Sequence, residues 1–498
     1  MSNLRHVWIW LVVSGVSTTL ACNAERPSEG ESTDRAPVTI GSVAEEAKLT
    51  ASVTLGTQLG ISVAISGDTL LAGAHRDDVP SEDAGAAFVF ERANGIWSVP
   101  TRLSVADPAE CVFGQAVALD GNTALVSAGA FNCGTRSGAV YVFDRSGGTW
   151  SAVQKLIASD ATPQGTFGFS LAIQGDTAII GATARASAYV FVRSLGVWTE
   201  QAKLVPSVPA ASFGWSVSLD GDSAIVGAQQ ADGFAGAAFV YARSGTTWTE
   251  QVRLVAPAAG FPFFGTSVAM SGDTVLVGSG GPAVVDSGSV HVFTGAGAAW
   301  ALEATLTPSD GNIGDGFGTS IALQGDVAVI GSPVDYHEEA DLSEAGSAYL
   351  FARSSGVWTE TFKLTASDAA ENDEFATSVG MSGNTLAFGA PNNLRRGAAY
   401  AFTFTVVPED ADGDGVEDPA DECPETVPGE VVDADGCSIA QHCPCAGPSG
   451  SACGWRNHGA YVRCVQKTAR AYFREGLITR QQKLEFVKSA AKADCGRR

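Results

Sequence analysis

Positive charge, histidine and helical periodicity are all scarce in this chain of 498 residues. It has 30 Lys and Arg against 54 Asp and Glu, for a formal net charge of −24, and so acidic a composition argues against nucleic-acid binding. Only His75, His291 and His337 lie between residues 59 and 404. That stretch also has no serine elbow, zinc-binding helix or Lys/Arg cluster, which disfavours an enzyme. It shows no helical period, so we expect strands there.

An apolar run long enough to span a bilayer is missing from the N-terminus. Val7–Val16 follows Arg5 and is too short for a transmembrane helix, but it suits the core of a signal peptide. The string from Thr19 to Cys22 resembles a bacterial lipobox, which implies lipidation of Cys22, although Thr19 stands where such boxes usually have Leu. We therefore expect a signal peptide with a lipobox over 1–22 and a disordered tether over 23–44. Simple secretion is the alternative, and both place the protein outside the cytoplasm.

Seven copies of one strand-rich pattern fill residues 45–407. Each copy has a Phe-Gly-like step, an apolar strand, a Gly-Asp or Gly-Asn turn, a second strand and a Gly-Ala-x-Tyr/Phe-x-Phe strand. The turn glycines recur every 46 to 58 residues and are Gly67, Gly121, Gly175, Gly221, Gly272, Gly325 and Gly383. A period of that length built from strands predicts a β-propeller.

Each copy contains enough strands for one propeller blade. In the third copy, residues 170–173 and 178–180 flank a two-residue hairpin, residues 188–191 form a third strand, and a fourth leads from Trp198 to Leu204. A Trp stands six residues before a Leu in six copies: Trp97/Leu103, Trp150/Leu156, Trp198/Leu204, Trp248/Leu254, Trp300/Leu306 and Trp358/Leu364. Fixed spacing indicates one repeated packing role for these tryptophans.

The seventh copy lacks a fourth strand of its own. Residues 46–52 precede the first copy and match residues 362–367 of a complete copy. We therefore predict an all-β fold, a seven-bladed propeller of four-stranded blades, in which the N-terminal strand completes the seventh blade and closes the ring. Closure would remove the open sheet edges that invite aggregation.

The seven copies resemble the FG-GAP repeat family of integrin-type propellers. The Phe-Gly step occurs at Phe113-Gly114, Phe167-Gly168, Phe213-Gly214, Phe264-Gly265 and Phe317-Gly318, with departures at Leu59-Gly60 and Phe375-Ala376. A second Gly-Ala occurs at Gly73-Ala74, Gly181-Ala182, Gly227-Ala228 and Gly389-Ala390. Integrin blades often carry a calcium loop between their first strands, but here that place holds only Ser-Gly-Asp-Thr or a close variant. The resemblance thus implies no blade calcium, and the Asp residues are expected to form turns.

Alternating strand direction gives the propeller two different faces. The hairpin face carries the short connections between strands one and two and between strands three and four. The loop face carries the longer, variable connections between strands two and three and between blades. The two longest polar loops of this face lie in blades one and six. The first opens with His75, Arg76, Asp77 and Asp78, and the second opens with Asp335, Tyr336, His337, Glu338 and Glu339. We expect a ligand site there or, alternatively, plain solvated loops.

A calcium-binding linker is predicted over 408–437. Carboxylates recur at positions 1, 3, 5, 9 and 12 of a loop with Gly at position 6 and a backbone carbonyl at position 7, which suits calcium better than a merely acidic linker. The loop residues are Asp410, Asp412, Asp414, Val416, Asp418 and Asp421. Pro419 and Cys423-Pro424 disfavour a helix-loop-helix hand.

The same linker resembles bacterial thrombospondin type 3 repeats, which act as stiff, calcium-dependent spacers. That resemblance rests on the alternation of Asp-rich loops with Cys-Pro, continued by the string from Asp433 to Cys437. It implies that Cys423 pairs with Cys437. It also implies that Asp433 and Asp435 add calcium ligands.

Residues 438–498 are expected to form a cysteine-rich helical module. Helices are predicted near 461–475 and 480–493, the second with a capping box at Thr479. The surrounding cysteines are Cys443, Cys445, Cys453, Cys464 and Cys495. Export favours disulfides among them, and zinc with His458 is the alternative.

Two further cysteines lie in blade two. Cys111 and Cys133 fall on loops of the same face, so a disulfide between them is geometrically reasonable, whereas a reducing compartment would leave free thiols. Apart from Cys22 the chain has nine cysteines. An odd count leaves one thiol free or paired between chains.

Two function classes remain open. One is a lipid-anchored, monomeric cell-surface binding protein that holds a protein or glycan on its loop face and has calcium in its linker. The other is an exported propeller enzyme, such as a hydrolase, a lyase or a quinone-dependent oxidoreductase. The scarcity of catalytic groups favours binding. His291 stands where other copies have Tyr or Phe, so we interpret it as a strand residue.

Overall fold

The structure, a computed structural model, describes most of the propeller and much of the C-terminal module. The described residues are 38–79, 84–105, 111–129, 137–257, 262–280, 287–337, 342–407, 426, 430–435, 437–445 and 455–495. Two compact units divide the chain: Ala36–Val407, and Met1–Arg35 together with Pro408–Arg498.

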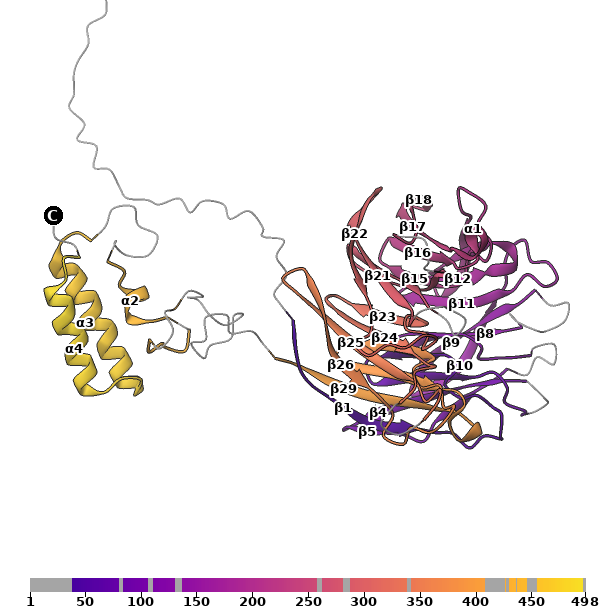
Figure 1. Ribbon diagram of the computed structural model, residues 1–498, viewed down its shortest axis with the longest axis horizontal. Helices are drawn as coiled ribbons and strands as arrows, with labels where there is room; N and C mark the ends of the chain where they lie inside the picture. Colours follow the sequence, from indigo (N-terminus) through magenta and orange to yellow (C-terminus); the bar gives the residue numbers. More distant parts are fainter. Residues whose placement is uncertain are drawn as a thin grey trace, which may run out of the picture. The chain divides into compact units, whose positions relative to one another are not determined.

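The first unit is a seven-bladed propeller of antiparallel sheets, as predicted (Figure 1). Blades one and two contain β2 (Val63–Ser66), β3 (Thr69–Ala74), β4 (Ala86–Ala93), β5 (Ile96–Trp97), β6 (Thr101–Leu103), β7 (Val117–Asp120), β8 (Thr123–Ala128), β9 (Ala139–Ser146) and β10 (Thr149–Leu156). Blades three and four contain β11 (Phe167–Gln174), β12 (Thr177–Ala182), β13 (Ser187–Ser194), β14 (Val197–Leu204), β15 (Val217–Asp220), β16 (Ser223–Ala228), β17 (Ala237–Ser244) and β18 (Thr247–Leu254).

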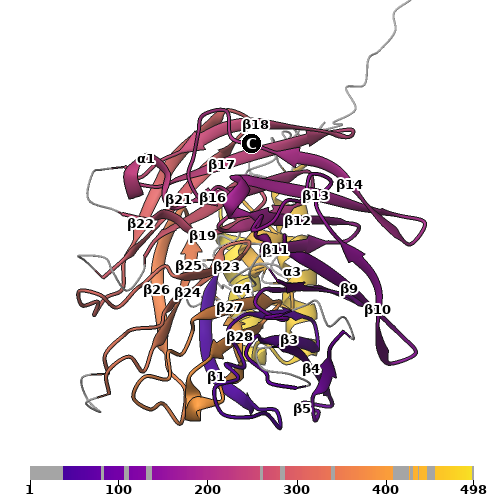
Figure 2. The same ribbon diagram turned by 90° about the vertical axis from the view of Figure 1, so that its right-hand side faces the viewer.

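The remaining blades are built in the same strand order. Figure 2 shows the ribbon turned by 90°. Blades five and six contain β19 (Phe264–Ser271), β20 (Thr274–Ser279), β21 (Ser289–Ala296), β22 (Ala299–Leu306), β23 (Ser320–Gln324), β24 (Val327–Ser332), β25 (Ser347–Ser354) and β26 (Val357–Leu364). Blade seven contains β27 (Ser378–Ser382), β28 (Thr385–Ala390), β29 (Ala398–Val407) and β1 (Thr39–Leu49). Short helices η1 (Thr183–Arg185), α1 (Ala231–Phe234) and η2 (Asn393–Arg395) follow the second strands of blades three, four and seven.

The N-terminal strand closes the ring, which confirms the prediction. β1 pairs antiparallel with β29, with Leu49 opposite Ala399. The strand begins at Thr39, so the prediction of a tether up to residue 44 is wrong for residues 39–44. Polar composition concealed this extension, because the strand is stabilised by backbone pairing with the long β29 and by burial of Ile40, which is 7% exposed.

A ring of hydrogen bonds links the turns of the hairpin face. In every blade, the side chain before the turn glycine accepts a hydrogen bond from the N–H of the turn glycine in the next blade, at 2.5 to 3.0 Å. The pairs are Ser66–Gly121, Asp120–Gly175, Gln174–Gly221, Asp220–Gly272, Ser271–Gly325, Gln324–Gly383 and Ser382–Gly67. The last pair joins blade seven to blade one, so the relay is continuous around the ring.

The repeated Phe-Gly and Gly-Ala steps form the contact between neighbouring blades. A Cβ added to the second-strand glycine would lie 1.8 to 2.3 Å from the carbonyl oxygen of the Phe-Gly-like step of the next blade. The glycines concerned are Gly73, Gly181, Gly227, Gly278, Gly331 and Gly389. The first residue of each step, which is Phe in six blades and Leu59 in blade one, is buried between the sheets; Phe213, for example, is 0% exposed. The motif therefore sets how closely adjacent sheets approach.

The turn Asp residues and the tryptophans belong to one structural clamp. In blade three, Arg193 donates from Nε to Asp176 Oδ1 at 2.6 Å and lies 5.2 Å from the ring centroid of Trp198. The same clamp occurs at Asp68/Arg92/Trp97, Asp222/Arg243/Trp248 and Asp326/Arg353/Trp358. In these four blades the tryptophan has one repeated packing role, as predicted, and the turn Asp is paired with arginine. Trp150 and Trp300 differ, because their indole N–H groups donate to Glu91 Oε1 and to the Gly297 carbonyl oxygen.

The C-terminal module contains α2 (Ile439–His442), α3 (His458–Glu475) and α4 (Arg480–Lys492). Thr479 caps α4 with the predicted capping box. Val465, Ala469 and Tyr472 of α3 pack into a small core with Ile439, Cys443, Ile478 and Ala490. Disulfides join Cys443 to Cys464 and Cys445 to Cys495.

These disulfides argue against the zinc alternative, because a cysteine in a disulfide has no free thiolate and four of the proposed ligands are in disulfides. Both ring nitrogens of His458 face backbone carbonyl oxygens, those of Cys495 at 2.9 Å and Ala491 at 3.2 Å. Cys111 and Cys437 are disulfide-bonded as well. Cys133, Cys423 and Cys453 lie outside the described residues, and no described cysteine is free.

Candidate functional site

Each blade places an aromatic or imidazole ring opposite one fourth-strand residue, near the loop face. The ring stands on the third strand, and in six blades its cross-strand partner is a Lys or Arg. These pairs are Phe88/Arg102, Tyr141/Lys155, Tyr189/Lys203, Phe239/Arg253, Tyr349/Lys363 and Tyr400/Lys48. Blade five differs, with His291 opposite Thr305. That position confirms the interpretation of His291 as a strand residue.

In blades three, six and seven an Asp from the preceding connection completes the cluster. In blade three, Tyr189 donates from its hydroxyl to Asp160 at 2.6 Å, and Lys203 donates to the same carboxylate at 2.7 Å. Asp310 and Asp368 take this place in blades six and seven. Hydrogen bonds from Lys203 and Tyr189 hold the pKa of Asp160 well below its usual range. The base of the loop face is thus ordered by ion pairs at three points.

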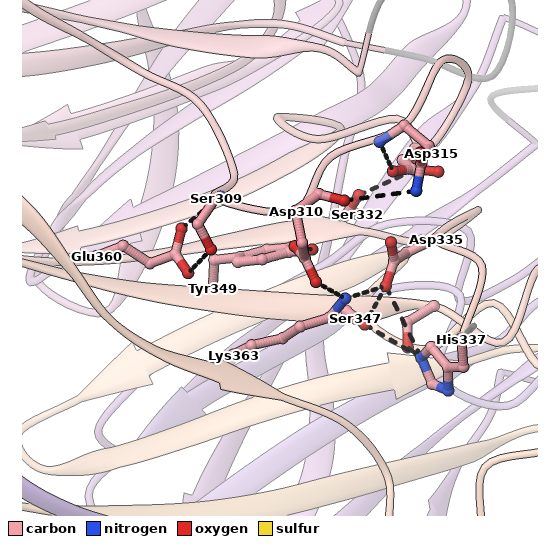
Figure 3. Close-up of polar contacts among 12 residues, drawn as sticks. Ser309, Asp310, Asp315, Ser332, Asp335, His337, Ser347, Tyr349, Glu360 and Lys363 are labelled. Carbon is pink, nitrogen blue, oxygen red and sulfur yellow. Dashed lines mark hydrogen bonds and ion pairs between the residues drawn. The ribbon is translucent and has the colours of Figure 1, made fainter. Parts of the chain in front are cut away.

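Blade six carries the most elaborate of these clusters (Figure 3). Lys363 bridges two carboxylates, with Nζ 2.7 Å from Asp310 Oδ2 and 2.8 Å from Asp335 Oδ2. Asp335 is 1% exposed and also accepts a hydrogen bond from the Ser347 hydroxyl at 2.6 Å. His337 Nε2 lies 3.0 Å from the Gly346 carbonyl oxygen and 3.9 Å from Asp335 Oδ2. A single lysine therefore serves both carboxylates.

A third carboxylate leaves the blade-six cluster with an excess of negative charge. Asp315 is 3% exposed, and burial, followed by the nearby charge of Asp335, raises its pKa to about 6. Asp335 Oδ1 is buried without a hydrogen-bond partner among the described residues. In blade seven, Asn393 stands at the position of Asp335, and Asp373 stands at the position of Asp315. The Asn393 amide donates to Asp373 Oδ2 at 2.7 Å. Blade six has a carboxylate where blade seven has a donor.

The predicted ligand loops are only partly available to a ligand. Asp77 is 2% exposed and is bound by Arg102 at 3.0 Å, and His75 is 8% exposed. Together with Asp335 these side chains are packed at the bases of their loops, which corrects the expectation that they face a ligand. Arg76, Asp78 and Tyr336 are exposed. Glu338 and Glu339 lie outside the described residues.

Sequence reasoning missed the Asp-Tyr-Lys clusters, although a signal was present. The string Leu-x-Ala/Pro-Ser-Asp ends at Asp160, Asp310 and Asp368. Its Ser makes a second contact between blades; Ser309, for example, donates from both N and Oγ to Glu360 at 2.8 Å. Glu45 of β1 binds Ser367 in the same way, so the closing strand reproduces the contact of an ordinary fourth strand.

The described residues contain one group that could hold a metal ion: Asp433, Cys437 and His442. Cys437 is disulfide-bonded, and His442 Nε2 lies 2.6 Å from Asp433 Oδ2, so all three side chains already have partners. Asp435 is exposed, and its N–H donates to Asp433 Oδ1 at 3.2 Å. The predicted ligands from Asp410 to Asp421 lie outside the described residues, so calcium in the linker stays a prediction.

Comparison with known protein families assigns the repeats. The FG-GAP repeat matches residues 43–90, 103–143, 150–191, 198–241, 248–293, 300–351 and 358–402. The chain belongs to the FG-GAP repeat family. Each FG-GAP repeat begins on the fourth strand of one blade and ends on the third strand of the next, so repeats and blades are offset by one strand. The first repeat therefore supplies β1 to blade seven.

Two other comparisons add little to the FG-GAP assignment. No curated protein sequence matches this FG-GAP chain. Among solved structures, a chain in the crystal structure of the Mitotic Checkpoint Complex is similar at 14% identity and a TM-score of 0.46, over 77% of this chain and 97% of that chain. A TM-score this low carries no argument about function.

Proposed function

We propose that this FG-GAP protein is an exported cell-surface binding protein that holds a protein or glycan on its loop face. The observation that carries the proposal is the difference between the two faces of the propeller. Two-residue turns of one type recur on the hairpin face, whereas the connections between second and third strands range from 183–186 in blade three to 333–346 in blade six. Variable loops on a rigid scaffold are typical of binding surfaces.

The ordered bases of these loops support recognition by a prearranged surface. Ion pairs hold Asp77 in blade one and Asp335 in blade six, while the neighbouring Arg76 and Tyr336 remain exposed. Anchoring a loop at its base lowers the entropy lost on binding. A guanidinium and a phenol ring are also the side-chain types enriched in binding hot spots.

Anchoring and calcium complete the proposal. Cys22 would carry the lipid that tethers the protein to the bacterial surface, and the linker with Asp410, Asp412 and Asp414 would bind calcium as a spacer. The support for both is the sequence pattern. None of the helices in the described part of the chain is long and apolar enough to cross a membrane.

The test is a glycan and protein array probed with the purified mature chain, with and without calcium. Any hit is then measured with the double variant Arg76→Ala and Tyr336→Ala, which we expect to weaken binding by about tenfold or more because hot-spot side chains contribute most of the affinity. Leu195→Asn is the matched control. Leu195 is fully exposed on the hairpin face with φ of 50°, a conformation that Asn tolerates.

Binding that is lost equally in the control would contradict a site on the loop face. So would turnover on a substrate panel without any binding partner, which would favour the exported enzyme instead.

A further inference from the structure

The solvent-facing side of α3 carries an unpaired line of positive charge. Arg463, Lys467, Arg470 and Arg474 follow one another at intervals of four, three and four residues, and all four are exposed. These intervals place them on one face of the helix, opposite the buried Val465, Ala469 and Tyr472. With 1.5 Å rise per residue, the line is about 16 Å long.

No acid neutralises this line within the described residues. None of the four side chains takes part in an ion pair. Between residues 455 and 498 the chain has eleven Lys and Arg but only Glu475, Glu485 and Asp494 as acids, a net charge of about +8 in a protein whose total is −24. Like charges at i and i+4 on a helix destabilise it. Binding of an anionic partner would relieve this repulsion between like charges, which favours the bound state.

The shape of the line decides among anionic partners. The apolar face of α3 is packed in the core of the module, so the helix cannot bury that face in a bilayer. Within the described helix α3, Phe473 lies next to Arg474, but the Lys483 ammonium is 4.3 Å from its ring centroid and occupies one ring face that a single-stranded nucleic acid would stack on. A single row of guanidinium and ammonium groups instead fits a linear chain of carboxylate or sulfate groups, to which Arg can donate two hydrogen bonds at once.

We propose that the line formed by Arg463, Lys467, Arg470 and Arg474 binds a linear acidic polysaccharide. This site lies in the C-terminal module and does not depend on binding at the loop face. At physiological ionic strength, charges more than about 8 Å apart in solvent are largely screened. The line can therefore act locally in a protein whose remaining residues are acidic.

The experiment measures binding of the full mature chain to polygalacturonate and heparin, with neutral dextran as the reference, over a salt series. The test variant is R463Q/K467Q/R470Q/R474Q. We expect its affinity for both acidic polysaccharides to fall about 10- to 100-fold, since each exposed ion contact contributes modestly and four are removed. The wild type should also bind more weakly as salt rises.

A matched control separates the line from net charge. The variant R456Q/R480Q/K488Q/K492Q removes the same four charges from exposed positions of the same module outside the line, and we expect an affinity within about twofold of the wild type. The variant R463K/R470K/R474K keeps the charge but removes the paired guanidinium donors, so it should bind more weakly than the wild type and more tightly than the test variant. Circular dichroism and the melting temperature verify that each variant is folded.

Several outcomes would overturn the proposal. They are no binding of the wild type to either acidic polysaccharide, an equal loss in the test and control variants, and tighter binding to anionic phospholipid vesicles or to DNA than to the polysaccharides.

Discussion

A buried imidazole at the third-strand ring position distinguishes blade five from the other blades. His291 is 0% exposed, between the Ser289 and Thr305 hydroxyls, and burial lowers its pKa to about 4 from 6.5. Between these two pH values the unfolded chain binds a proton that the folded chain does not. Stability contributed by the neutral ring is therefore present above pH 6.5 and is lost as the pH falls toward 4.

We expect the variant His291→Phe, which uses the residue found in blades one and four, to lose less stability on acidification than the wild type. The difference between the two proteins should grow by up to about 3 kcal/mol between pH 7 and pH 4.5. Urea denaturation at several pH values measures it. Parallel pH profiles for the two proteins would show that His291 does not titrate in this way.

The buried carboxylate pair in blade six makes stability depend on pH in the opposite direction. The pKa of Asp315 is raised to about 6 from 3.8, so its contribution to stability is present at low pH and is lost as the pH rises through 6. Asp335→Asn reproduces the arrangement of Asn393 and Asp373 in blade seven. We expect this variant to be more stable than the wild type at pH 8, by about 1–3 kcal/mol.

Thermal denaturation at pH 8 and pH 5 tests the prediction for Asp335→Asn, with a larger gain expected at pH 8. Asp310→Asn serves as the comparison. It removes a partner of both Tyr349 and Lys363 without relieving Asp315, so it should destabilise the protein. A loss of stability in both variants at both pH values would mean that Asp335 acts only as the counter-ion of Lys363.

The second strands depend on glycine where neighbouring blades meet. A Cβ on Gly389 would lie 1.8 Å from the carbonyl oxygen of Gly60, a backbone atom that cannot give way easily. We expect Gly389→Ala to destabilise the propeller by about 3 kcal/mol or more. In the same blade, a Cβ on Gly380 would meet its nearest atom at 3.4 Å, so Gly380→Ala should be tolerated. Melting temperatures of the two variants make the comparison, and equal losses would contradict the contact described here.

The closing strand covers the open edge of blade seven. Deleting residues 39–49 would expose the backbone of β29 and remove the contact between Glu45 and Ser367. We expect a protein that aggregates or melts well below the wild type, because an open sheet edge pairs with other chains. Size-exclusion chromatography and a melting curve test this. A monomeric deletion variant with an unchanged melting curve would mean that the propeller is stable without β1.

Sequence alone could predict the ring, because its signals are local and repeated. The glycine spacing predicts the number of blades, and the likeness of residues 46–52 to 362–367 identifies the closing strand. The environment of single loop residues was much harder to predict. From the sequence, Asp77 is expected in an exposed loop, but the fold places it beside Arg102, which lies 25 residues later on β6. The close approach of Asp315 and Asp335 likewise depends on how two connections pack within one blade.

At the scale of the whole molecule, calcium should affect the two units differently. The Asp residues of the described blade turns at positions 68, 176, 222 and 326 are held by arginine, whereas the linker has the spacing of a calcium loop. We expect calcium to raise the melting temperature of the C-terminal unit and to leave the propeller transition unchanged. Differential scanning calorimetry with calcium or EDTA measures this, and Asp414→Asn should abolish the shift. A propeller transition that moves with calcium would contradict the assignment.

The one-strand offset between repeats and blades has a consequence for biosynthesis. β1 is among the first parts of the propeller to leave the ribosome, yet its partner β29 is the last, with Ser42 and Thr405 separated by 363 residues. A truncated product that lacks the final repeat would thus have β1 without its pairing partner at one end and an unpaired sheet edge at the other. The seventh blade can form only when β1 and β29 are both present in the chain, so a product that ends early keeps an exposed sheet edge.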